Sequence, residues 1–146
     1  MKIRGHHLAC VYCYLGSGKN SGVDFFGVAN SIPELLDLLR SNPDMEITVW
    51  DDVDDVCDVC PLRRSRGCGR GKDPVAQNQK LRSWDKEILG RLGLHAGDRT
   101  TPRQVEAKMR ETIGDIGQIC TNCASSAASG WQEFRHGIAK GLWPKE

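Results

Sequence analysis

The feature that most constrains this chain is a cysteine-rich run from Val56 to Cys68, which reads V-C-D-V-C-P-L-R-R-S-R-G-C. Cys57 and Cys60 form a C-x-x-C pair, and the short turn between them directs both thiols to the same side, as in metal-binding loops. Pro61 follows directly and stiffens the loop, because its ring fixes φ and removes an N–H. Cys68 adds a third thiol. One further ligand from elsewhere in the chain would complete a four-ligand site.

Two more C-x-x-C pairs lie far from this run in the sequence. Cys10 and Cys13 form one pair, and Cys120 and Cys123 form the other. Apolar and aromatic residues surround Cys13, so we interpret it as a buried structural thiol. The predicted metal ligands are the other six cysteines: Cys10, Cys57, Cys60, Cys68, Cys120 and Cys123.

The spacing of these cysteines excludes two common kinds of metal site. A zinc ribbon places its two pairs about 15 to 20 residues apart, whereas 59 residues separate Cys60 from Cys120. The central run also differs from the bacterial ferredoxin pattern C-x₂-C-x₂-C-x₃-C-P. One [4Fe–4S] cluster with ligands from distant segments fits better, although six thiols exceed the four it needs. The alternatives are zinc held by distant pairs and a thiol–disulfide protein that uses Cys120 and Cys123.

Two adjacent histidines precede the first cysteine pair. Residues 2–7 are predicted to form a short strand that leads into a loop with His6, His7 and Cys10. A strand sends adjacent imidazoles to opposite faces, so we expect at most one of them beside Cys10. That histidine would be a metal ligand, a general acid–base group or a donor to cluster sulfur. His6 and His7 are therefore the candidate catalytic residues.

Length and composition favour one cytoplasmic domain over residues 1–146. The chain has 146 residues, of which 39% are hydrophobic and 27% charged, enough for a core of its own. A net charge of +1 gives no reason to expect a nucleic-acid partner. No apolar run approaches the roughly 20 residues of a membrane span, and the start lacks a signal-peptide cleavage site. Cytoplasmic thiols stay reduced, which favours metal or redox chemistry for the seven cysteines. The sequence does not predict an oligomeric state.

Local signals predict a mostly helical α+β fold with four to five helices and a small two-stranded β element. The strands are residues 2–7 and the β-branched segment 47–50, which we expect to pair. Proline at the first helical position and a capping box at Thr101 and Gln104 mark helix starts. We expect the cysteine-bearing loops to converge on one site. Helices are predicted over residues 23–31, 33–40, 74–92, 101–113 and 131–140.

Opposite charges flank the central cysteines. Residues 51–58 contain five aspartates, and residues 63–72 contain five basic residues. We interpret both as solvated loop faces, as charge runs usually are. Alternatively, Arg63, Arg64 or Arg66 would stabilise an anionic cluster. In a zinc-stabilised interaction module, the basic stretch would dock an acidic partner.

Four short motifs are spread along the chain: R-G-H-H-L-A-C at residues 4–10, D-V-C-D-V-C-P at residues 55–61, Trp84-Asp85, and I-C-T-N-C at residues 119–123. Together with the later Cys68 they resemble a small prokaryotic family, domain of unknown function twelve-eighty-four. The resemblance implies a protein that binds an iron–sulfur cluster, without an assigned reaction. The chain departs from the family pattern at its end, where the last cysteine is missing and the aromatic residue is displaced to Trp131.

These patterns together predict an iron–sulfur protein, and two roles are compatible with one. Four protein ligands would suit electron transfer to a redox partner protein. Three ligands would leave an open iron, a Lewis acid, for small-molecule chemistry and hence for an enzyme.

Overall fold

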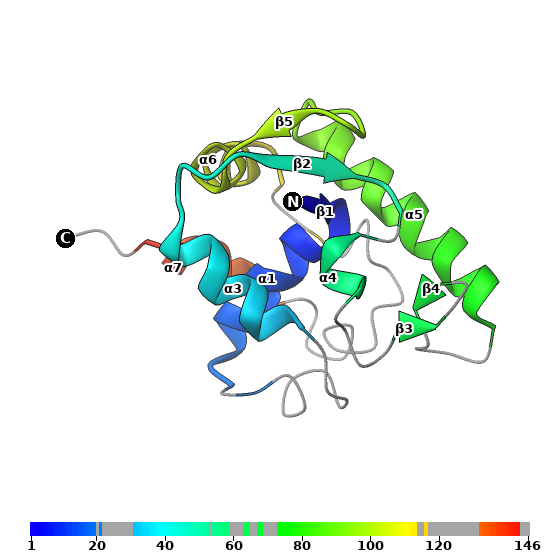
Figure 1. Cartoon of the computed structure of the whole chain (residues 1–146). Coiled ribbons are helices and arrows are strands. Elements are labelled where there is room, and N and C mark those ends of the chain that lie inside the picture. The colour runs from blue at the N-terminus through cyan, green and yellow to red at the C-terminus, as the bar shows by residue number, and fades with distance from the viewer. Residues whose placement is uncertain are drawn as a thin grey trace.

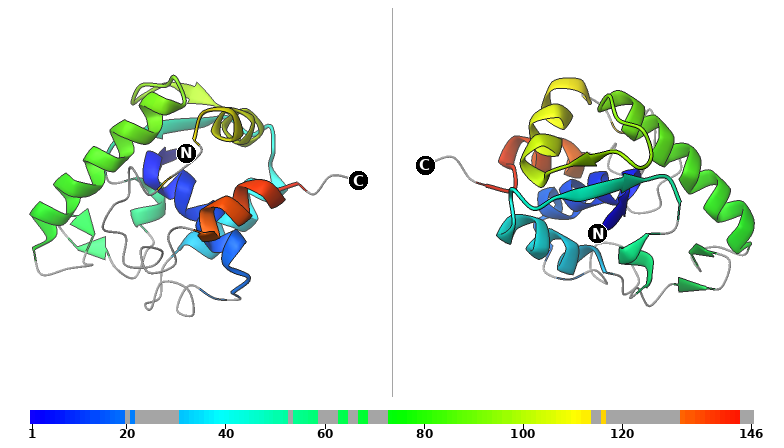
Figure 2. Two further views of the ribbon diagram at one scale, coloured as in Figure 1. Left: turned by 180° about the vertical axis from the view of Figure 1, so that it is seen from behind. Right: turned by 45° about the horizontal axis from the view of Figure 1, so that its top comes forward.

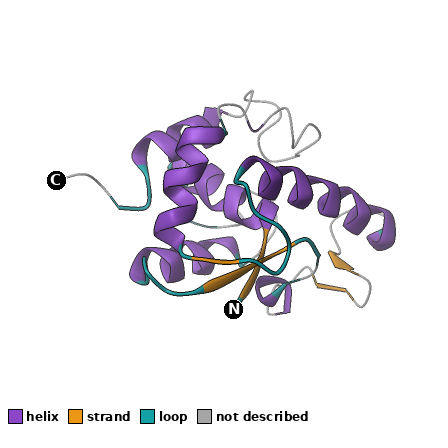
Figure 3. Cartoon of the chain, turned by 90° about the horizontal axis from the view of Figure 1, so that it is seen from above, coloured by secondary structure: helices purple, strands orange, loops and turns teal. Residues whose placement is uncertain are grey.

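The computed structural model describes residues 1–19, 21, 31–52, 54–58, 63–64, 67–68, 73–113, 116 and 132–143, with backbone alone at 57–58, 63–64, 67–68 and 74. The helices are α1 (Gly5–Ser17), α3 (Ile32–Ser41), α4 (Asp55–Asp58), α5 (Pro74–Arg91), α6 (Pro102–Thr112) and α7 (Gln132–Lys140). The strands are β1 (Lys2–Arg4), β2 (Ile47–Trp50), β3 (Arg63–Arg64), β4 (Gly67–Cys68) and β5 (Arg99–Thr100). The predicted mostly helical α+β fold is confirmed (Figures 1 and 3).

The sheet has one strand more than predicted. β1 pairs with β2 in parallel, with Ile3 opposite Val49, so the expected pairing of these strands is confirmed. β5 adds an antiparallel third strand beside β2, and β3 pairs with β4 in a separate ribbon. Two-residue strands carry too little alternation to be recognised in a sequence. One face of β2 is core, because Ile47 and Val49 are fully buried while the alternate residues Thr48 and Trp50 are partly exposed.

α1 is the central helix of the molecule and corrects the predicted loop after the first strand. It contacts α3, α5 and α7 (Figure 1), and nine of its 13 residues are buried. A helix with so little exposed surface needs no amphipathic pattern, which is why its apolar run gave no helical signal. α1 ends at Gly18, whose φ of 71° is readily adopted only by glycine.

Two glycines bring α1 and α7 into direct backbone contact. A Cβ on Gly16 would overlap the backbone of Glu133, and a Cβ on Gly137 would overlap the carbonyl of Tyr12. Figure 2 shows α7 lying along α1. The predicted last helix is confirmed as α7, which buries Phe134 against the core.

The remaining predicted helices have the expected start and stop signals. α3 has proline in its first turn and is capped at its C-terminal end by Asn42. α6 is capped by the Thr101 side chain, which accepts a hydrogen bond of 3.2 Å from the amide of Gln104. α5 is capped by Asp73 and is followed by Gly93 at a φ of 73°. The helix predicted over residues 23–31 lies outside the described residues. No helix in the described ranges is long and apolar enough to cross a membrane.

The glycine contact predicts a large effect of one methyl group. Gly137→Ala should lower the free energy of unfolding by about 1–3 kcal/mol, because the helices must move apart to admit the Cβ. Gly90→Ala is the matched control, since a Cβ there meets nothing within 4 Å. It should raise stability by about 0.5–1 kcal/mol, the helix preference of alanine over glycine. Urea unfolding of both variants measures the difference; equal effects would show that α1 and α7 are not in backbone contact.

Candidate functional site

The first turn of α1 is held by a carboxylate from α5. Asp85 Oδ1 accepts hydrogen bonds from the backbone amide of His6, at 2.9 Å, and from its ring Nδ1, at 2.8 Å. A carboxylate here satisfies an otherwise unpaired helix amide and faces the positive end of the helix dipole. Gly5 permits this approach, because a Cβ on it would lie 2.6 Å from the backbone oxygen of Asp85.

Arg4 provides the charge that balances Asp85. Its guanidinium contacts Asp85 Oδ2 through Nε and through a terminal nitrogen, both at 2.8 Å, and both side chains are fully buried. A second terminal nitrogen donates to Asn78 Oδ1 at 3.1 Å, and the Asn78 amide donates to Asp52. The Nε hydrogen bond and the second short contact, both to one carboxylate oxygen, hold the two charged groups against each other.

A second aspartate holds the other side of the same turn. Asp54 Oδ2 accepts from the backbone amide of Arg4 at 2.6 Å and lies 2.9 Å from the ring Nδ1 of His7. Asp54 is 3% exposed. The sequence suggested that the acidic run at residues 51–58 is a solvated loop face. The burial of Asp54 shows that this interpretation does not hold for the whole run. One of its carboxylates is part of the site.

The charges around His6 determine its protonation. Burial lowers the pKa of His6 to about 4, and the attraction of Asp85 does not offset this. Burial raises the pKa of Asp85, but its contacts with His6 and Arg4 outweigh burial and hold that pKa below its ordinary value. At neutral pH the carboxylate is ionised and can only accept, so the neutral imidazole carries its proton on Nδ1. Nε2 of His6 then has the lone pair.

The helical backbone changes the relation between the histidines and Cys10. His6 and His7 precede Cys10 by four and three residues, so all three lie on one face of α1. The expectation of opposite faces is wrong, because it assumed a strand. The two imidazole rings lie 4.4 Å apart, centre to centre. Cys10 is partly buried, and Cys13 is 7% exposed, which confirms the predicted burial of Cys13.

The other predicted ligands are described only in part. The backbone of Cys57 lies in α4, which contacts β1, and the backbone of Cys68 lies in β4, which contacts α5. Cys60, Cys120 and Cys123 lie outside the described residues, as does the predicted convergence of the cysteine loops. Among the side chains that the structure describes, no three histidines, cysteines or carboxylates are grouped as metal ligands.

Comparison with known families gives one match. The family model described as "Protein of unknown function (DUF1284)" matches residues 27–128. The chain belongs to this family. The matched residues of this DUF1284 protein include the central and last cysteine groups, whereas the R-G-H-H motif and Cys10 precede them. No curated protein and no solved structure matches the chain significantly.

Asp85 and Asp54 are the site residues to which sequence reasoning gave no role. Asp85 had a detectable signal, because it lies four residues after Leu81 and three before Ile88 on the apolar stripe of α5. A carboxylate at a core position of a helix indicates a buried partner. Asp54 had no comparable signal among its acidic neighbours.

The ion pair predicts a strong effect of neutralising Asp85. Asp85→Asn should lower the free energy of unfolding by about 3–5 kcal/mol, because it leaves the buried charge of Arg4 without its counter-ion. Asp44→Asn is the control, since it breaks an exposed pair with Arg103 and should leave stability nearly unchanged. Urea unfolding monitored by tryptophan fluorescence measures both. A mild effect of Asp85→Asn would contradict a charged Arg4–Asp85 pair.

The low pKa of His6 predicts a pH dependence of stability. The unfolded chain binds a proton on His6 below a pH of about 6.5, whereas the folded protein binds it only below about 4. Stability should therefore fall as the pH is lowered between these values, by at most about 3 kcal/mol from this group. His6→Gln should remove this part of the slope, and His95→Gln, at a side chain 91% exposed, should keep it. An unchanged slope in His6→Gln would mean that His6 is not buried neutral.

Proposed function

We propose that this DUF1284 protein binds an iron–sulfur cluster, most simply one [4Fe–4S] cluster. Three thiolates of the central run would hold it, together with thiolate from one of the other two cysteine pairs. Thiolates are the ligands that such clusters require, and the chain has more than enough. The candidate ligands are Cys10, Cys57, Cys60, Cys68, Cys120 and Cys123.

The observation that carries the proposal is the attachment of the central run to the histidine end of α1. α4, which bears Cys57, contacts β1, and β1 continues directly into α1. β4, which bears Cys68, contacts α5, and α5 supplies the Asp85 that holds the start of α1. The two elements that bear candidate ligands, α4 and β4, thus contact β1 and α5, which lie next to the start of α1. Cys10 lies one turn further along the same face.

The surrounding residues can hold and move a proton beside such a cofactor. The cluster would supply electron transfer when four thiolates bind it, or an open iron when three do. His6 donates its Nδ1 proton in a hydrogen bond to Asp85, so the lone pair on its Nε2 is available as a proton acceptor. Arg4 keeps Asp85 ionised, which fixes this orientation of the ring. A redox partner protein is expected in the first case and a small-molecule substrate in the second.

The test is metal and sulfide analysis of protein purified without oxygen. We expect about four irons and four sulfides per chain, with visible absorption. Cys57→Ala and Cys68→Ala should lose most of both, whereas Cys13→Ala, at the buried structural thiol, is the matched control and should keep them.

Other outcomes would contradict the cluster and identify an alternative. One zinc per chain without colour would indicate a zinc-stabilised interaction module. If the protein contained no metal and all seven thiols reacted with an alkylating agent, the remaining alternative would be a thiol–disulfide protein. That alternative requires one thiol of low pKa at Cys120 or Cys123.

A further inference from the structure

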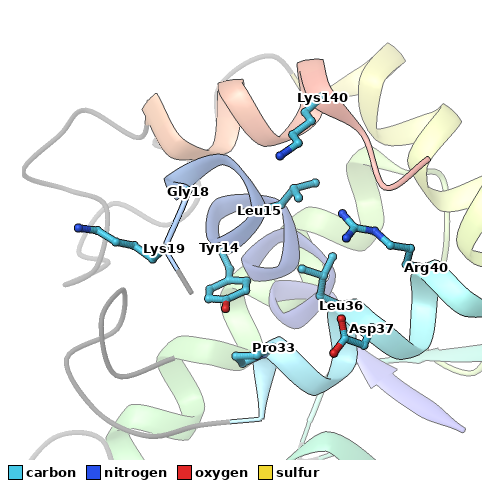
Figure 4. Close-up of a pocket in the computed structure, with 9 residues that line it drawn as sticks. All are labelled: Tyr14, Leu15, Gly18, Lys19, Pro33, Leu36, Asp37, Arg40 and Lys140. Atoms are coloured by element: carbon cyan, nitrogen blue, oxygen red, sulfur yellow. The ribbon is translucent and has the colours of Figure 1, made fainter. Parts of the chain in front are cut away.

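A cavity separate from the cysteine and histidine residues lies between α1, α3 and α7 (Figure 4). Its volume is about 380 Å³, within the range of small-molecule sites, about 300–1,000 Å³. The floor consists of Leu15 and Tyr14 from α1 and Leu36 from α3, which are 6–8% exposed. The cavity is therefore large enough for a small organic molecule, and these three side chains give its base a limited apolar surface.

The rim of this cavity carries an excess of positive charge. Arg40, Lys140 and Lys19 line it, against the single carboxylate of Asp37. In Figure 4 the ends of Arg40 and Lys140 point over the cavity, whereas Lys19 extends away from it. Within the part of the chain that the structure describes, none of the three cations forms an ion pair.

Helix dipoles account for only part of this arrangement. Arg40 lies in the last turn of α3 and Lys140 in the last turn of α7, where cations offset the negative helix end. That explains one cation on each helix but not why both reach over the same apolar floor. Arg40 is also held in place, because its Nε donates to the carbonyl of Leu142 at 3.0 Å. Its position therefore does not have to be ordered when a ligand binds.

We propose that this cavity binds a small organic anion, with an apolar body against Leu15 and Leu36 and a carboxylate between Arg40 and Lys140. The apolar floor supplies burial, and the two cations supply charge-assisted hydrogen bonds to the carboxylate. The site is independent of the proposed cluster, because its lining includes no cysteine and no histidine.

The test uses sodium benzoate as the probe and benzamide as its neutral counterpart, titrated into the full chain. Methyl signals of Leu15 and Leu36 in NMR spectra report binding in the cavity. Lys140→Gln should weaken benzoate binding about three- to fivefold, the effect expected of one exposed charge contact. Asp37→Asn should strengthen it by a similar factor, since it removes the one opposing charge. Lys86→Gln and Glu111→Gln, which make the same changes of net charge elsewhere, should leave binding unchanged.

The opposite results would overturn the proposal. Benzamide that binds as tightly as benzoate would show that the cations do not take part. If Lys86→Gln weakened benzoate binding as much as Lys140→Gln, the effect of Lys140 would be explained by the net charge of the protein alone. An absence of shifts at Leu15 and Leu36 throughout the titration would mean that the cavity does not take this class of ligand.

Discussion

The structure depends on one buried ion pair, between Arg4 and Asp85. Neither group could be buried alone, since an isolated charge in the interior costs several kcal/mol. Their pairing joins the end of β1 to the middle of α5, and the same carboxylate holds the first turn of α1. A single side chain thus fixes a strand and two helices. It also sets the proton of His6, so the chemistry of the site and the stability of the fold share one group.

The far part of α1 is held in a different way. The Tyr12 hydroxyl donates a hydrogen bond of 3.2 Å to Oε1 of Glu106 in α6. This carboxylate oxygen also accepts a hydrogen bond of 2.6 Å from the backbone amide of Leu142. Beside this network, Gly16 and Gly137 let two helix backbones touch. The histidine end of α1 is therefore held by charge and its other end by close packing, with a buried hydrogen-bond network between them. A helix held along its whole length can present Cys10, His6 and His7 in a fixed relation.

Local signals in the sequence predicted what local physics determines. The helix α3 has proline in its first turn, α6 follows a capping threonine, and the strand at residues 47–50 is β-branched, so short windows sufficed. The fold class and the first strand pairing followed from these elements. The helical state of α1 did not, because burial on all sides by distant segments removes the periodic pattern. The role of Asp85 depends on a partner 81 positions away, and no local rule specifies which of many arginines that partner is. The convergence of the thiols stays a prediction.

The packing of α1 against α7 has a consequence for the order in which the protein can form. α1 emerges during synthesis before the helix that covers it, which follows after roughly 115 further residues. At about 5–20 residues per second, the ribosome needs roughly 6 to 23 seconds to supply α7. Through that interval the surface of α1 around Gly16 has no covering helix, and the native contact closes a very long loop. The nascent chain therefore carries the thiols of Cys10 and Cys13 before their final environment exists.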